Sequence, residues 1–217
     1  FNEYFAVFYV GWYVLLGWVA YFILYMLTEN LIPPERCHEI HCRLDDLIPF
    51  NEYFAVFYVG WYVLVAGALL RTLLYDVESF KKVQIFIMIT QGAAMAIYIL
   101  WPSRQDLRPA VFPRENIFSA IMAFIYDFDT STGVCPSLHA AYSIGILSVG
   151  LKDGTISKLG KAALAFFVVM VCVSVCFVKQ HSALDVLAAL PVCLLAEILL
   201  YGKEYWLPKL RRERIRK

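Results

Sequence analysis

Charged side chains are scarce in this sequence of 217 residues, where Asp, Glu, Lys and Arg make up only 17%. An average soluble domain has roughly 25%. The two signs nearly cancel to a formal net charge of +1, so no nucleic-acid partner is predicted. A hydrophobic share of 61% excludes intrinsic disorder, a collagen-like fibre and a small disulfide scaffold. Apolar runs fill the sequence instead, and they predict one domain embedded in a lipid bilayer.

Six apolar segments approach the roughly 20 residues that a helix needs to cross a bilayer. They cover Tyr4 to Leu27, Tyr53 to Tyr75, Val83 to Trp101, Ser137 to Leu151, Ala162 to Val178 and Ser182 to Tyr201. The fourth and fifth are short and need flanking residues or a locally thinner bilayer. We therefore predict an all-α membrane protein, a six-transmembrane-helix bundle formed by residues 1–217. A short interfacial helix at residues 116–126 is expected before the fourth span.

Basic residues are concentrated on one side of this predicted bundle. Of the 19 Lys and Arg residues, 13 lie near or after the ends of the second, fourth and sixth spans. Cytoplasmic loops carry the excess of Lys and Arg, so both termini are predicted to be cytoplasmic. The connections after the first, third and fifth spans then face outward. No basic stretch or small-residue cleavage site precedes the first span, so no signal peptide is expected.

The first fifteen residues, FNEYFAVFYVGWYVL, recur letter for letter at residues 50–64. Internal repeats in membrane proteins are normally weak in sequence. An identical copy with no further similarity indicates a recent duplication, or an artefact of cloning or sequence assignment, and we favour the artefact. No function is therefore assigned to residues 1–15.

All four histidines fall on the predicted outward side. His181 begins the sixth span, and Asp185 lies four residues later on the same helical face. Such a carboxylate can hold one imidazole nitrogen and leave the other free as a nucleophile. His139 starts the fourth span after Pro136 and Ser137, where helix amides favour an anion. A surface pair without function is the alternative, but an ionisable residue at a membrane boundary favours function.

A third outward segment, residues 101–109 (WPSRQDLRP), contributes arginines. The fork of a guanidinium suits phosphate oxygens, although contact with lipid headgroups is the alternative. Together with the PSLH segment at 136–139 and the His181–Asp185 pair, these residues resemble the type-2 phosphatidic acid phosphatase superfamily. That family contains membrane lipid-phosphate phosphatases and phosphotransferases, and the similarity points to a bacterial branch.

The match to the three signatures of that family is partial. The family has Lys-x6-Arg-Pro, Pro-Ser-x-His and Ser-Arg-x5-His-x3-Asp, whereas here Trp101 replaces the lysine and Val175 replaces the arginine. Two cations that would neutralise a bound phosphate are therefore missing. Lys179 is the first candidate to substitute for them and Arg104 the second. If neither points into the site, a phosphodiester, which carries less charge, is favoured over a phosphomonoester.

The resemblance implies a single catalytic domain that works through a phosphohistidine. His181 would attack phosphorus, Asp185 would orient it, and His139 would protonate the leaving alcohol and then activate the acceptor. No metal and no cofactor are expected. The residues expected to bind the phosphate are Arg108, Ser137, Lys179 and Arg104.

The acceptor decides the function that the resemblance implies. Water would make the protein a phosphatase acting on a lipid phosphomonoester or pyrophosphate. A lipid alcohol would make it a phosphotransferase of the sphingolipid-synthase kind. A non-catalytic lipid-binding or transport protein is the third alternative. The expected partners are a lipid phosphate and membrane lipids, at the outer face of a bacterial plasma membrane, while the particular lipid and the oligomeric state stay open.

Other polar residues have simpler interpretations. The segment CHEIHC at residues 37–42 matches no common zinc spacing, and its cysteines are expected to pair with each other, with Cys135, or not at all. Asp45 and Asp46 are expected to cap the second span rather than to contact Arg108. Glu197, inside the sixth span, is expected to pair with a lysine of the C-terminal tail.

Overall fold

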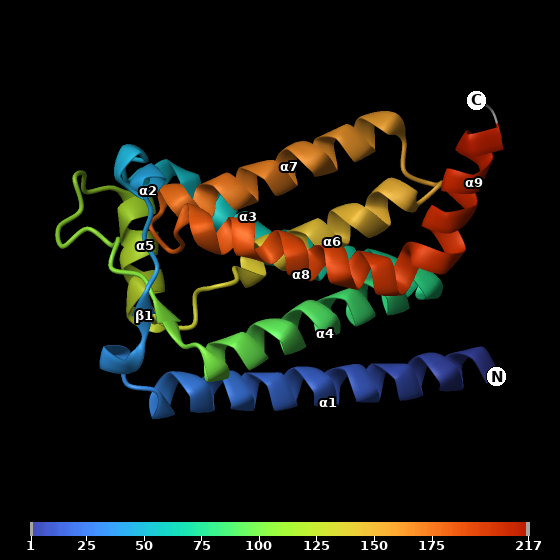
Figure 1. Ribbon diagram of the computed structural model, residues 1–217, viewed down its shortest axis with the longest axis horizontal. Helices are drawn as coiled ribbons and strands as arrows, with labels where there is room; N and C mark the ends of the chain where they lie inside the picture. The colour runs from blue at the N-terminus through green and yellow to red at the C-terminus, as the bar shows by residue number, and fades with distance from the viewer. Residues whose placement is uncertain (1, 216–217) are drawn as a thin grey trace.

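The computed structural model describes residues 2–215, with side chains described at residue 12 and over 15–28 and 31–212. Within this part of the chain, six long helices run along the longest axis of the molecule (Figure 1). They are α1 (Asn2–Leu31), α3 (Ala55–Tyr75), α4 (Val77–Leu100), α6 (Leu138–Lys152), α7 (Lys158–Phe177) and α8 (Ala183–Tyr201). Most side chains of the first repeated segment lie outside the described residues, so the interpretation of the repeat stays a prediction.

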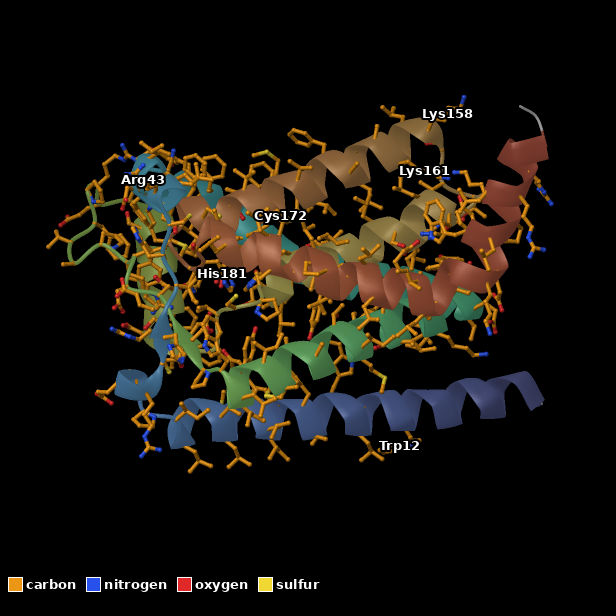
Figure 2. All side chains as sticks on the ribbon, in the orientation of Figure 1. Trp12, Arg43, Lys158, Lys161, Cys172 and His181 are labelled. Atoms are coloured by element: carbon orange, nitrogen blue, oxygen red, sulfur yellow. The ribbon has the colours of Figure 1, made fainter. Side chains whose placement is uncertain are left out.

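Successive long helices run in opposite directions, and their connections alternate between two ends of the bundle (Figure 1). At one end α1 begins and α9 (Leu207–Ile215) finishes, after a π-helical turn at residues 202–206. The other end, called the loop end below, holds the shorter elements. Figure 2 shows His181 toward the loop end and Lys158 and Lys161 at the opposite one. Which end faces the cytoplasm stays a prediction.

The loop end is built from short elements that come from distant parts of the chain. Strands β1 and β2 pair in parallel, with His38 opposite Ser103. The elements at this end are η1 (Pro34–Arg36), β1 (His38–Glu39), α2 (Arg43–Leu47), η2 (Glu52–Phe54), β2 (Ser103–Arg104) and α5 (Ile117–Phe128). Asn116 caps α5, which confirms a short helix before the fourth span.

Two spans begin earlier than the hydropathy alone predicted. Helix α4 begins at Val77 because Asp76 accepts a hydrogen bond from the amide of Ser79. Helix α7 begins at Lys158 because Ser157 caps it, and it reaches 20 residues. The expectation of a short fifth span was therefore wrong, since polar cap residues rather than the first apolar residue start the helix. Helix α6 is short, at 15 residues.

The outer faces of the long helices are apolar. On α8, for example, Leu187, Leu190 and Leu194 are each about half exposed. Such a surface is a liability in water and is suited to lipid. Among the described residues, four helical stretches are long and apolar enough to cross a membrane, at 52–75, 77–100, 158–177 and 183–212. The chain is therefore an all-α protein of the membrane type, while the number of six spans stays a prediction.

Helix α6 lies in the middle of the bundle, in contact with α3, α4, α7 and α8. Small residues permit this position, because a Cβ added to Gly145 would lie 2.5 Å from the ring of Phe86 on α4. Ala140 and Ala141 are buried in the same core cluster. The first turn of α6, which carries His139, is thereby held inside the protein.

The acid inside α8 has a partner other than the expected one. Glu197 Oε1 lies 2.7 Å from Lys152 Nζ, and the indole of Trp206 donates to the same carboxylate over 2.6 Å. Lys152 is the last residue of α6, which packs against α8. The prediction of a tail lysine was wrong because a neighbouring helix end offers a nearer cation.

Candidate active site

The two histidines singled out by sequence meet at the loop end. The centroids of the His139 and His181 rings lie 5.5 Å apart. His181 lies in the connection between α7 and α8, and its Nδ1 is 3.2 Å from Asp185 Oδ2. The amide of Ser182 donates to the same oxygen over 2.9 Å, which fixes the buried carboxylate in place. With Nδ1 held by Asp185, the Nε2 of His181 is the nitrogen left for attack.

His139 is enclosed by two aromatic rings of α3. The ring centroids of Trp61 and Tyr58 lie 4.3 and 4.7 Å from that of His139. Its Nε2 is buried and has no hydrogen-bond partner within the described part of the chain. A buried ring nitrogen without a partner is costly in a purely structural role. The two aromatics carried no functional signal in the sequence, because aromatic residues in a span are normally core or interface.

Ser137 joins the start of α6 to the start of α8. Its hydroxyl caps α6 by accepting from the amide of Ala140, and its own amide donates to the carbonyl of Asp185 over 3.0 Å. The residue is fully buried. The Ser137 amide is thus engaged within the protein, and a contact between Ser137 and a phosphate stays a prediction. The hydrogen bonds of Ser137 keep His139 and Asp185 at a fixed separation.

Arg108 lies at the loop end and connects to the histidines through Gln180. Its Nη2 donates to Gln180 Oε1 over 2.6 Å and to the carbonyls of Asp129 and Thr130. Its Nη1 donates to the carbonyl of Tyr126, whose ring lies 4.5 Å from the guanidinium carbon. Burial lowers the pKa of Arg108 from its ordinary value. The Nε of Arg108 is buried without a partner among the described residues, so this donor remains for a ligand.

Lys179 is held by the backbone of the α2 region rather than by the histidines. Its Nζ donates to the carbonyls of Asp45 and Ile48, over 2.8 and 2.6 Å. Its backbone is left-handed, with φ of 54°, and the amides of Gln180 and His181 both turn back to one carbonyl of α7. Lys179 therefore shapes the turn that presents His181, and its ammonium is not placed as the expected replacement cation.

Arg104 also has other partners. Its Nη1 lies 2.6 Å from Asp106 Oδ2, and its backbone pairs with Glu39 in the small sheet. The Nζ of Lys179 and the Nη1 of Arg104 are therefore engaged away from the histidines, while the Nε of Arg104, like that of Arg108, is buried without a partner among the described residues. Arg108 is the cation that the described residues bring into this hydrogen-bonded site.

Asp45 caps a helix, but a different one from the expected second span. It accepts from the hydroxyl of Ser182 and, over 2.8 Å, from the amide of Ala183 at the start of α8. Burial alone would raise the pKa of Asp45, but these hydrogen bonds together hold it below its ordinary value. The prediction that Asp45 caps the second span was wrong, because that helix, α3, begins only at Ala55, whereas Asp45 lies within the separate helix α2. Asp45 thus fastens α2 over the His181 turn.

Asp129 belongs to the site although no motif marked it. Its Oδ2 accepts from Gln180 Nε2 over 3.1 Å and from the Tyr58 hydroxyl over 3.4 Å. The Tyr25 hydroxyl donates to Oδ1 over 3.3 Å. Burial raises the pKa of Asp129, while the nearby His181 and Arg108 oppose this shift. The only sequence signal was an acid directly after the apolar α5 segment.

The cysteines on the predicted outward side, Cys37, Cys42 and Cys135, are free thiols in the structure. Burial, reinforced by the nearby Asp185, raises the pKa of Cys135 to about 12, so this thiol is protonated and unreactive. Among the described residues, no group of three or more His, Cys, Asp or Glu side chains is placed to hold a metal ion.

Comparison with known proteins adds little to these observations. No protein-family model and no curated protein match the sequence. Among solved structures, that of Aquifex aeolicus LpxE is similar, with 19% identity, 74% of this chain and 86% of that chain covered, and a TM-score of 0.48. A similarity this distant assigns neither family nor function. The protein is defined at this point as an all-α, membrane-type protein with a His–His–Asp–Arg cluster in which His181 and Asp185 are buried.

Proposed function

We propose that the protein is a membrane enzyme that transfers the phosphoryl group of a lipid phosphate through His181. The observation that carries this proposal is the 5.5 Å separation of two imidazole centroids, one in the first turn of α6 and the other, paired with Asp185, in the turn before α8. Together with Arg108 they supply a nucleophile, an orienting carboxylate, an acid–base group and a cation. These are the residues that the resemblance to the type-2 phosphatidic acid phosphatase superfamily implies.

The reaction has two balanced steps. In the first, Nε2 of His181 bonds to phosphorus while the bond from phosphorus to the lipid oxygen breaks. The leaving oxygen keeps the electron pair and takes a proton from His139. In the second, the oxygen of an acceptor attacks phosphorus and gives its proton to His139, and the N–P electron pair returns to His181. Asp185 holds the Nδ1 proton of His181 throughout, and the Nε–H of Arg108, which has no partner among the described residues, binds a phosphate oxygen in this proposal.

The membrane placement is part of the same proposal. The long helices act as six spans, and the basic residues that follow the second, fourth and sixth put the opposite end in the cytoplasm. The loop end, and with it the histidines, then faces the outside of a bacterial plasma membrane. A site at this depth can take a phosphate at a lipid headgroup while the acyl chains stay in the bilayer.

Two acceptors are compatible with this chemistry. Water gives the phosphatase predicted first, which acts on a lipid phosphomonoester or pyrophosphate. A lipid alcohol gives a phosphotransferase, and two observations favour this second candidate. Lys179 and Arg104 are engaged elsewhere, which leaves the site with few cations. The Nε2 of His139 is buried, and a dry site protects a phosphohistidine from water.

The test uses the detergent-purified protein with EDTA present and a panel of radiolabelled lipid phosphates. Free phosphate, transferred lipid products and acid-labile phosphoenzyme are measured together. We expect His181→Ala to abolish both turnover and phosphoenzyme, and His139→Ala to lower turnover by 10²-fold or more. His41→Ala is the matched control, because His41 forms an exposed pair with Asp46 at the same end, over 2.7 Å. Wild-type activity in His181→Ala, or no phosphoenzyme in the wild type, contradicts the proposal.

A further inference from the structure

The proposed site contains a carboxylate that the reaction does not use. Asp129 is hydrogen-bonded by Gln180, the residue immediately before the nucleophile, and by Tyr58, whose ring packs on His139. Gln180 in turn accepts from Arg108. The carboxylate of Asp129 is therefore linked through Gln180 to the nucleophile His181 and to the cation Arg108. It is linked through Tyr58 to the acid–base group His139.

Within the described part of the chain, no ion pair neutralises the charge of Asp129. Its hydrogen-bond donors among the described residues are an amide and phenols, which carry no charge. The N–H groups of Arg108 donate instead to carbonyl oxygens, including the backbone carbonyl of Asp129 itself. The carboxylate of Asp129 thus offsets the charge of Arg108, the cation that the described residues bring into the site, without accepting a hydrogen bond from it.

This arrangement bears on the charge of the substrate. A lipid phosphomonoester carries nearly two negative charges at pH 7, because its second pKa is about 6, and a phosphodiester carries one. In the family signatures, a lysine and an arginine would stand at positions 101 and 175, which are here Trp101 and Val175. With those cations absent and Asp129 present, a second charge on the phosphate finds no partner.

We propose that Asp129 is a specificity-determining residue that restricts the site to phosphates with one negative charge, and that the substrate is therefore a phosphodiester-linked lipid. This inference rests on the proposed function and deepens it. Gln180 acts as a positioning residue, since it hydrogen-bonds both Arg108 and Asp129 and keeps the cation and the carboxylate at a fixed separation.

The test compares two substrates with the same leaving group. Diacylglycerol phosphate and its methyl ester have identical acyl chains, carry two and one negative charges at pH 7.5, and both release diacylglycerol when His181 attacks. Their ratio of kcat/KM cancels any general loss of activity. We expect the wild type to prefer the methyl ester, and Asp129→Asn to raise the relative rate of the monoester about tenfold. Removing one unit charge from the partly buried surroundings of the phosphate is expected to change the ratio by about this factor.

A matched control and a pH series separate this role from a structural one. Asp127→Asn removes an exposed carboxylate from α5, two residues away, and should leave the ratio unchanged, as should Asp129→Glu, which keeps the charge.

Below pH 6 the monoester becomes singly charged. The wild-type ratio should therefore shift toward the monoester as the pH falls, and this shift should flatten in Asp129→Asn. The charged or titratable groups around Asp129 are the same for both substrates: Arg108, His181, Tyr25 and Tyr58.

The outcomes are distinct. An equal loss on both substrates in Asp129→Asn overturns the inference and leaves the proposed function intact. If that variant does not fold, the pH series on the wild type decides, and a ratio that stays flat, or that favours the dianion, overturns the inference. If the wild type releases no diacylglycerol from either substrate and forms no phosphoenzyme, the proposed function fails and the inference with it.

Discussion

Replacing Asp45 with alanine is expected to loosen the turn that carries His181. Asp45 is only 3% exposed and accepts hydrogen bonds from Ser182 and Ala183 at the start of α8 and from the amide of Cys42. Removing the carboxylate leaves these buried donors without a partner, at about 1–3 kcal/mol for each unsatisfied group. Partial access of water reduces the sum, so we expect a loss of roughly 3 kcal/mol in the free energy of unfolding.

The effect on activity should exceed the effect on substrate affinity. Asp45 does not contact the histidines but fixes the helix start that holds Asp185 against His181, so its loss should lower kcat about tenfold or more. The measurements are thermal unfolding in detergent and diacylglycerol release. Asp46→Ala is the control, because Asp46 lies next in sequence and its side chain is 64% exposed. A change in stability below about 0.5 kcal/mol for Asp45→Ala, the range of ordinary surface substitutions, would refute the reasoning.

The pH dependence of this contact has a defined sign. The pKa of Asp45 lies below its ordinary value of 3.8 in the folded protein. The stabilisation is therefore fully present above that value and is lost as the pH falls through the depressed folded pKa. The difference in stability between the wild type and Asp45→Asn should accordingly shrink as the pH falls below about 4. If this difference in stability stays constant down to pH 2, the negative charge of Asp45 is not its cause.

Two further substitutions test packing and phosphate binding. Gly145→Ala should destabilise the protein by about 1–3 kcal/mol, because the new Cβ would lie 2.5 Å from the Phe86 ring. Gly154→Ala, at a position with open space around it, should not destabilise the protein. Equal melting temperatures for the two variants would contradict the close packing of α6. Arg108→Lys keeps the charge but cannot reproduce the fork that contacts Tyr126 and Gln180 at once. It should lower kcat/KM more than tenfold, and full activity would show that a point charge suffices.

The features that the sequence determined by itself are local ones. Apolar segments of sufficient length predicted the long helices, because a helix satisfies its own backbone hydrogen bonds and its hydropathy is a property of one continuous segment. The pair of His181 and Asp185 followed from helical spacing alone, since residues four apart share a face. The polar cap residues that lengthened α7 were also visible in the sequence, but hydropathy outweighed them in the prediction.

The choice of partner for each isolated polar group was decided only by the tertiary structure. Asp45 and Ser182 are 137 positions apart, and Lys179 finds its carbonyls 131 to 134 positions away. A charged side chain takes whichever partner the packing of distant helices brings within hydrogen-bond distance. For the same reason Asp129 joined the site while Lys179 and Arg104 did not.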